Sequence, residues 1–299
     1  MSEHEPIPPS RHVPVLAQEV LHWLDPRPGE VWVDATLGGG GHARLLAERV
    51  GPSGRLLALD QDAAAVERVR PSFAAMPWVS LHVANFESLP AVLAAAGLSA
   101  VDGVLADLGV SSDQLDDPAR GLAFAHDGPL DMRLSQTGTS AADLVNRLSE
   151  RELAEIIFRY GEERHSRRIA QRIVQARREA PIRTTGELAR LVRQCVPRSH
   201  GHSIDPATRT FLALRVAVND ELAVLEALLR ALPGCVRPGG RVGIISFHSL
   251  EDRPVKHALR DPTYWEVLTK KPITASSEEV ERNPRSRSAK FRAARRRAE

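Results

Sequence analysis

The sequence predicts an α/β fold, in which a mostly parallel sheet carries helices on both faces. Three observations lead to this prediction. An apolar run at residues 31–34 leads into four consecutive glycines, Gly38–Gly41, and then into an amphipathic segment. Further apolar, strand-like runs recur along the chain, separated by helical runs. Glycine-bearing turns join several of these runs. This alternation is typical of parallel sheets with helical crossover connections.

The expected strands end in acidic residues. Strands are expected at residues 31–34, 55–60, 79–84, 101–107 and 241–247, with helices at 43–50, 63–70 and 89–96. Asp34, Asp60 and Asp107 fall at or near the carboxyl ends of their strands. Ligands of open α/β sheets bind beyond these ends, so the three acids are expected near a ligand.

The alternation stops in the middle of the chain, which predicts an inserted helical domain. Capping-box patterns begin at Ser149 and Thr184, and arginines occupy several faces between them. Asp205 and Pro206 then start one long helix that returns to the last strand. The expected division is a first part of the sheet domain at 1–113, an inserted helical substrate-binding domain at 114–204, a second part of the sheet domain at 205–271, and a basic tail over the surface at 272–299.

The glycine turn indicates a nucleoside-containing cofactor but leaves its identity open. Gly38, Gly40 and Ala43 fit G-x-G-x-x-A, a form of the dinucleotide fingerprint. Counted from Asp34, the same turn also fits the D-x-x-x-G-x-G loop of enzymes that use S-adenosylmethionine (SAM). Asp60 ends the next strand and is placed to accept hydrogen bonds from a ribose.

Charge and cysteine content indicate a cytoplasmic protein with an anionic partner. Residues 1–130 carry a balance of −9 and residues 131–299 a balance of +11, which give the net charge of +2. The basic residues concentrate at 159–198 and 282–297, and such regions attract phosphate. The two cysteines form no metal-binding pattern, and no apolar run approaches membrane-spanning length, so we expect neither a metal site nor a membrane segment.

The loop after residue 107 favours chemistry on an amino group. A dehydrogenase would require a proton donor there, usually His, Tyr or Lys, and residues 105–115 contain none. Asp107 instead heads a glycine-bearing loop, where a carboxylate is able to accept hydrogen bonds from an exocyclic amine.

Taken together, eight motifs resemble the bacterial MraW/RsmH family. They are His12-Val-Pro-Val-Leu16, Gly38-Gly-Gly-Gly-His42, Asp107-Leu-Gly-Val-Ser-Ser112, Gly128-Pro-Leu-Asp-Met-Arg133, Tyr160-Gly-Glu-Glu163, Ala207-Thr-Arg-Thr-Phe211, Ser246-Phe-His-Ser-Leu-Glu-Asp252 and Asn283-Pro-Arg-Ser-Arg-Ser288. The resemblance implies a class I (Rossmann-like) SAM methyltransferase fold with an inserted helical domain. It also implies methylation of the exocyclic N4 of a cytidine in the decoding region of 16S ribosomal RNA, with an assembled or near-assembled small subunit as substrate.

The resemblance also assigns roles by position. It implies SAM contacts at Gly40, Gly41 and His42, ribose binding by Asp60, adenine packing by Phe86, and the methionine end and amine pocket at Asp107 and Gln114, with Asp107 catalytic. Ser246 and His248 are candidates for contact with the target base, and Arg285 and Arg287 for contact with RNA. Two departures stand out: Gly39 replaces a non-glycine residue, and Val110 stands where an aromatic is usual.

Two alternatives of other classes remain open at this stage. One is an NAD(P)-dependent oxidoreductase, which the dinucleotide fingerprint allows but which leaves the basic tail unexplained. The other is a non-catalytic RNA-binding factor for ribosome assembly that retains the fold. Binding of SAM against NAD separates the first, and methyl incorporation separates the second.

Overall fold

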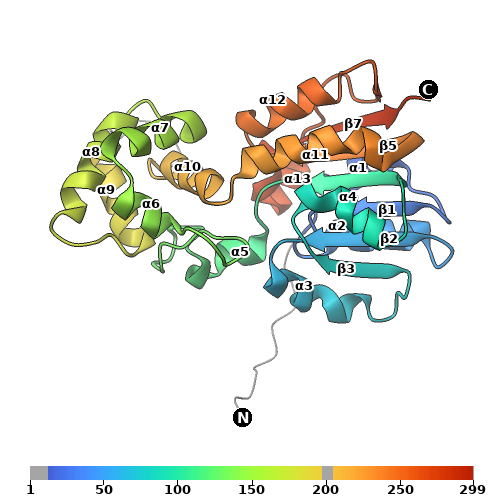
Figure 1. The fold of residues 1–299 in the computed structure, drawn as a ribbon, viewed down its shortest axis with the longest axis horizontal. Helices are drawn as coiled ribbons and strands as arrows, with labels where there is room; N and C mark the ends of the chain where they lie inside the picture. Colours follow the sequence, from blue (N-terminus) through green and yellow to red (C-terminus); the bar gives the residue numbers. More distant parts are fainter. Residues whose placement is uncertain (1–12, 197–204, 299) are drawn as a thin grey trace, which may run out of the picture. The chain divides into compact units, whose positions relative to one another are not determined.

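The computed structural model describes residues 13–196 and 205–298, and the chain forms two compact units (Figure 1). The first unit comprises Met1–Ser111 and Leu222–Glu299, and the second comprises Ser112–Glu221. None of the helices in these described ranges is long and apolar enough to cross a membrane.

The first unit is built on one seven-stranded sheet in the order β3-β2-β1-β4-β5-β7-β6. The strands are β1 (Val31–Asp34), β2 (Arg55–Asp60), β3 (Val79–Val83), β4 (Val101–Asp107), β5 (Val236–Ser246), β6 (Trp265–Val267) and β7 (Lys290–Arg296). Strands β1 to β5 pair in parallel, whereas β7 pairs antiparallel with both β5 and β6. The five strands expected from the sequence are therefore present, and β5 begins five residues earlier than expected.

Helices cover both faces of this sheet, as expected. They are α1 (Ala17–Leu24), α2 (Gly41–Val50), α3 (Ala63–Val69), α4 (Leu89–Ala95), α11 (Glu221–Cys235), α12 (Ser249–Ala258) and α13 (Ser277–Arg282). One apolar cluster joins the sheet to α4, α11 and α12 through side chains such as Leu93, Leu228 and Val255. The other joins it to α1, α2 and α3 through side chains such as Leu24 and Leu46. Burial of these two clusters holds the unit together.

The expectation of a basic tail on the surface is wrong in its main part. Residues 290–296 form β7, which pairs with β5 on one side and with β6 on the other. Phe291, Ala293 and Ala294 are buried. Arginines lie between and beside these apolar residues, so the composition of the segment is basic although these apolar side chains pack in the sheet. The Arg292 guanidinium is buried and pairs with Asp252 at 2.7 Å, and Arg295 pairs with Glu266.

The expectation of one long helix after Asp205 is also wrong. The structure has α10 (Thr208–Val218) and α11, separated at Asn219 and at Asp220, whose φ is +49°. The Asn219 side chain explains the break, because its amide donates to the Met132 carbonyl and accepts from the Leu134 amide. Helix α10 belongs to the second unit, so the unit boundaries fall at 111/112 and 221/222 instead of 113/114 and 204/205.

The second unit is helical in its described part, apart from the irregular segment at residues 121–140, short connections and isolated bridges. Its helices are α5 (Ser112–Asp116), α6 (Ala141–Arg147), α7 (Glu150–Gly161), α8 (Ser166–Arg177), α9 (Thr185–Cys195) and α10. Capping boxes start α7 at Ser149 and α9 at Thr184, which confirms both predicted helix starts. Helix α8 carries four arginines and no acidic residue, while Ile169 and Ile173 face the core.

Candidate active site

The glycine turn connects β1 to α2 at the carboxyl edge of the sheet. Gly40 has φ +80°, a left-handed conformation that glycine adopts without strain. A Cβ atom at Gly40 would also lie 3.2 Å from the Phe73 ring. The turn is fixed to β2, because the Gly38 amide donates to Asp60 Oδ2 at 2.8 Å. The turn and the acid after β2 thus form one hydrogen-bonded unit.

Asp60 ends β2 at the same edge of the sheet. Its Oδ1 atom accepts from the Asp62 amide at 2.9 Å and its Oδ2 atom from Gly38. A carboxylate is able to accept several donors at once, and ribose binding by Asp60 stays a prediction. The cap of α3 is Asp62, whose side chain accepts from the Ala64 amide, so Asp60 is not needed for that role.

Asp107 ends β4 and lies next to the glycine turn. Its backbone amide donates to Thr36 Oγ1 at 2.6 Å, which ties the end of β4 to the loop after β1. One carboxylate oxygen, Oδ2, lies 3.6 Å from His42 Nε2, an ion-pair distance too long for a hydrogen bond. The other oxygen, Oδ1, is buried and has no hydrogen-bond partner among the described residues. Such an atom is suited to accept a hydrogen bond from a ligand.

Two buried ionisable side chains, Asp34 and His42, lie at this edge together with Asp107. Burial raises the pKa of Asp34 to about 7, although the His42 charge opposes this shift. Burial by itself would lower the pKa of His42, but the Asp107 and Asp34 carboxylates outweigh it and raise that pKa above its usual range. Asp34 also orders the loop, because its Oδ1 atom accepts from the Thr36 amide at 3.0 Å.

The residues at this edge fit SAM. Asp34 Oδ2, both His42 ring nitrogens and Asp107 Oδ1 are buried without hydrogen-bond partners in the described part of the chain, and buried polar atoms normally have partners. Two further acids, Asp60 and Asp107, lie at the same edge as the glycine turn. Their carboxylates attract a cationic sulfonium and repel the negatively charged pyrophosphate of a dinucleotide. This pair of acids therefore favours SAM over NAD(P).

Phe86 and Gln114 remain predictions as cofactor contacts. Phe86 begins the short helix η2 (Phe86–Ser88) after β3 and packs half-buried against the cluster that includes Leu89. Gln114 lies on α5 in the second unit, where its side chain is buried.

Ser246 and His248 lie at the end of β5, the strand next to β4. The Ser246 hydroxyl is buried and donates to the Lys290 carbonyl on β7 at 3.4 Å. The His248 ring lies 2.9 Å from Glu251 Oε1, and Glu251 Oε2 accepts from the Phe247 amide at 2.8 Å. Contact of Ser246 and His248 with the target base stays a prediction. In the structure, the Ser246 hydroxyl joins β5 to β7.

Arg285 and Arg287 are exposed on the short helix η4 (Pro284–Ser288). They differ in this respect from Arg292, which is buried in β7. Both side chains are accessible to a phosphate group, as are those of Arg282, Arg295 and Arg297, and contact of Arg285 and Arg287 with RNA stays a prediction.

Sequence reasoning gave no role to two residues that shape this edge. Thr36 holds the amide of Asp107, and Glu251 holds the turn between β5 and α12. Glu251 left a usable signal, an acid in the first turn of a helix that follows a strand. Thr36 left none, because its partner lies 71 residues away in the chain.

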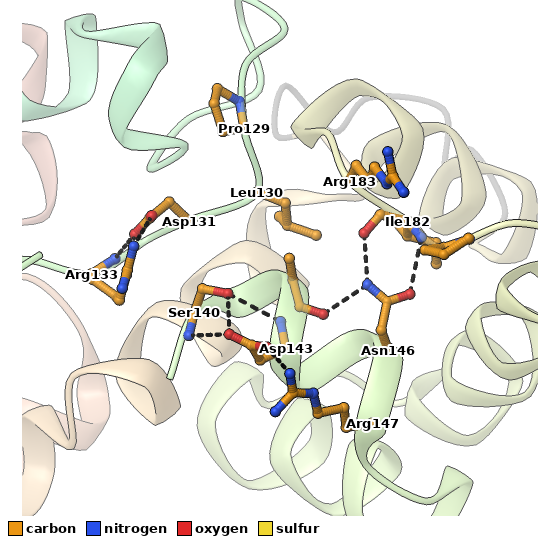
Figure 2. Close-up of a pocket in the computed structure, with 12 residues that line it drawn as sticks. Pro129, Leu130, Asp131, Arg133, Ser140, Asp143, Asn146, Arg147, Ile182 and Arg183 are labelled. Carbon is orange, nitrogen blue, oxygen red and sulfur yellow. Dashed lines mark hydrogen bonds and ion pairs between the residues drawn. The ribbon is translucent and has the colours of Figure 1, made fainter. Parts of the chain in front are cut away.

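A separate cavity of about 460 Å³ lies within the second unit (Figure 2). The Asn146 amide binds the Ala142 and Ile182 carbonyls at its edge. Arg133 pairs with Asp131 at 2.6 Å, and Arg147 pairs with Asp143 at 3.1 Å. Asp131 and Arg133 both belong to the Gly128–Arg133 motif. Their ion pair therefore gives this motif a structural role within its own loop.

Comparison with known proteins identifies the family of this chain. The model of the MraW methylase family matches residues 9–297. The ribosomal RNA small subunit methyltransferase H of Sorangium cellulosum is 52% identical over 301 residues, covering 98% of this chain and 95% of its own length. The protein of the same name in Deinococcus radiodurans is 51% identical over 292 residues, covering 97% and 92%. The chain belongs to the MraW methylase family.

Proposed function

We propose that this protein transfers a methyl group from SAM to the exocyclic N4 of a cytidine in 16S ribosomal RNA. Membership of a methylase family and about 50% identity to ribosomal RNA small subunit methyltransferases support the reaction class and the substrate. The structural observation that carries the proposal is the buried, unpartnered Oδ1 atom of Asp107 beside the glycine turn.

The residues of the site suit methylation of an amine. When bound, SAM supplies an electrophilic methyl group on a sulfonium. Cytosine N4 is a weak nucleophile because its lone pair is delocalised into the ring. Asp107 accepts a hydrogen bond from this amine, which favours the partly positive nitrogen of the transition state. Thr36 fixes the backbone of Asp107, so its carboxylate needs little reorganisation.

His42 completes the electrostatic environment of Asp107. Its ring is buried 3.6 Å from Asp107 Oδ2, and its raised pKa favours the charged form beside two carboxylates. His42 lies beside the Oδ2 atom of Asp107 and leaves Oδ1 as the oxygen that faces the amine. Asp60 holds the ribose, and the glycine turn lets the backbone approach the cofactor closely.

The second unit provides a basic surface for the RNA. Between residues 164 and 193 the sequence has nine arginines and two glutamates. Most of these arginines are exposed on or near α8 and α9. They attract the phosphate backbone, which offsets the cost of turning the target cytidine out of its stack, about a few kcal/mol. The proposed substrate is an assembled or near-assembled small subunit in the cytoplasm.

The two alternatives have lost their support. An oxidoreductase is not expected in a methylase family, and the Asp60 and Asp107 carboxylates beside the glycine turn disfavour a pyrophosphate. A non-catalytic assembly factor would not need an unpartnered carboxylate beside the glycine turn.

The test is methyl incorporation into small ribosomal subunits that lack this modification. Wild-type protein with radiolabelled SAM should label 16S RNA, and nuclease digestion with mass spectrometry should identify N4-methylcytidine. Asp107→Ala should bind SAM within about threefold of wild type by calorimetry, but lose transfer by about 10²-fold or more. Full transfer by Asp107→Ala would remove this residue from the mechanism.

A further inference from the structure

The segment of residues 13–16, called here the N-terminal strap, lies directly against the glycine turn. A Cβ atom built on Gly41 would be 2.9 Å from Pro14 Cδ, so Pro14 covers the first residue of α2. Val15 and Leu16 are buried, and the Val15 carbonyl is one of the groups that favour the charged form of His42. The strap therefore contacts two of the three residues that are expected to bind SAM in this turn.

The strap is fastened by residues from the other end of the chain. The Leu16 amide donates to Glu279 Oε1 at 2.7 Å, across 263 residues of sequence. The Asn283 side-chain amide donates to the Val13 carbonyl at 3.2 Å. Both partners lie on α13 or directly after it. These two hydrogen bonds hold the two ends of a four-residue segment.

Leu16 needs such a partner. It is the N-cap of α1 with φ +54°, a left-handed conformation that is unfavourable for leucine, and its own side chain provides no cap. A charged acceptor for its amide stabilises this conformation. Helix α13 is followed in the chain by η4 and then by β7, which pairs with β5. The strap is thus held by a segment that leads directly into the sheet.

We propose that Glu279 and Asn283 are positioning residues, which hold the N-terminal strap on the glycine turn and thereby set the affinity for SAM. This inference rests on the proposed cofactor site at the glycine turn. The C-terminal segment acts through the strap and needs no contact of its own with the cofactor. A strap fixed in advance lowers the entropy that binding must remove, so its release weakens binding.

The experiment measures binding of S-adenosylhomocysteine by calorimetry and amide hydrogen exchange in the ligand-free, full-length protein. Glu279→Ala should weaken binding about tenfold, the scale of one hydrogen bond to a charged group. It should also speed exchange at Leu16 and at residues 40–42. Glu279→Gln keeps an acceptor oxygen of the same reach and should restore most of the affinity. Glu281→Ala, an exposed glutamate on the same helix, is the matched control and should match wild type.

The outcomes separate this inference from the proposed function. In steady-state methylation, Glu279→Ala should raise KM for SAM while kcat stays within about twofold. Faster exchange at Leu16 with unchanged ligand affinity would show that the hydrogen bond from Leu16 to Glu279 has a structural role only, and would overturn the inference. Equal affinities of the alanine and glutamine variants, both weakened, would also overturn it, because the acceptor oxygen would then be irrelevant. Failure of wild type itself to bind would instead count against the proposed cofactor site.

Discussion

The buried carboxyl of Asp34 makes the stability of the sheet unit depend on pH. Its side chain is fully buried at the end of β1, and burial raises its pKa from 3.8 to about 7. The folded state therefore binds a proton that the unfolded state has already released at pH 5. The free energy of unfolding must therefore fall as pH rises from the ordinary pKa of 3.8 to about 7. Above about pH 7 the contribution of Asp34 no longer changes with pH. Asp34→Asn keeps the shape of the side chain and removes the titration.

The size of the effect follows from the shift. One pKa unit corresponds to 1.36 kcal/mol, so the full change of roughly three units is worth about 4 kcal/mol. Of this, roughly 3 kcal/mol is lost between pH 5 and pH 8. The raised pKa of His42 acts in the same direction, because its stabilising charge is also lost as pH rises. The Asn variant should therefore gain relative stability toward alkaline pH, and any constant cost of the substitution cancels between pH values.

Urea unfolding followed by tryptophan fluorescence gives a clean assay. The four tryptophans, at positions 23, 32, 78 and 265, all lie in the sheet unit, so their fluorescence reports that unit alone. The difference in unfolding free energy between Asp34→Asn and wild type should rise by about 3 kcal/mol from pH 5 to pH 8. A difference that stays constant over this range would show that Asp34 titrates at its ordinary value, and the argument from burial would fail.

Two further predictions concern the core of the sheet unit. Gly103→Ala on β4 should lower stability by about 1–3 kcal/mol or more in thermal unfolding, because its Cβ would overlap the buried Trp32 ring. Gly234→Ala, where a Cβ meets nothing within 4 Å, is the control, and an equal loss in both variants would contradict the packing argument. Deletion of residues 290–299 should abolish cooperative unfolding of the unit, because it removes β7 and the buried Phe291. If the truncated protein unfolds at the wild-type temperature, residues 290–299 do not stabilise the sheet and act as a surface tail.

The sequence alone determined the parallel part of the sheet, the helices on both faces and the glycine turn. These features depend on local patterns. Apolar runs, amphipathic spacing and capping residues such as Ser149 and Thr184 act over a few neighbouring positions, where sequence reasoning is effective. The eight motifs added the family and the expected role of Asp107, which no single pattern specified.

Only the tertiary structure decided what the C-terminal residues do. Arg292 and its neighbours read as a solvated basic run, yet β7 fills a gap in the sheet because its alanines and Phe291 pack there and Asp252 neutralises Arg292. The link from Glu279 to Leu16 was equally invisible, since 263 residues separate the two. The shift in the pKa of Asp34 has the same origin. Burial and long-range partners arise only when distant segments meet, and a local pattern carries no record of them.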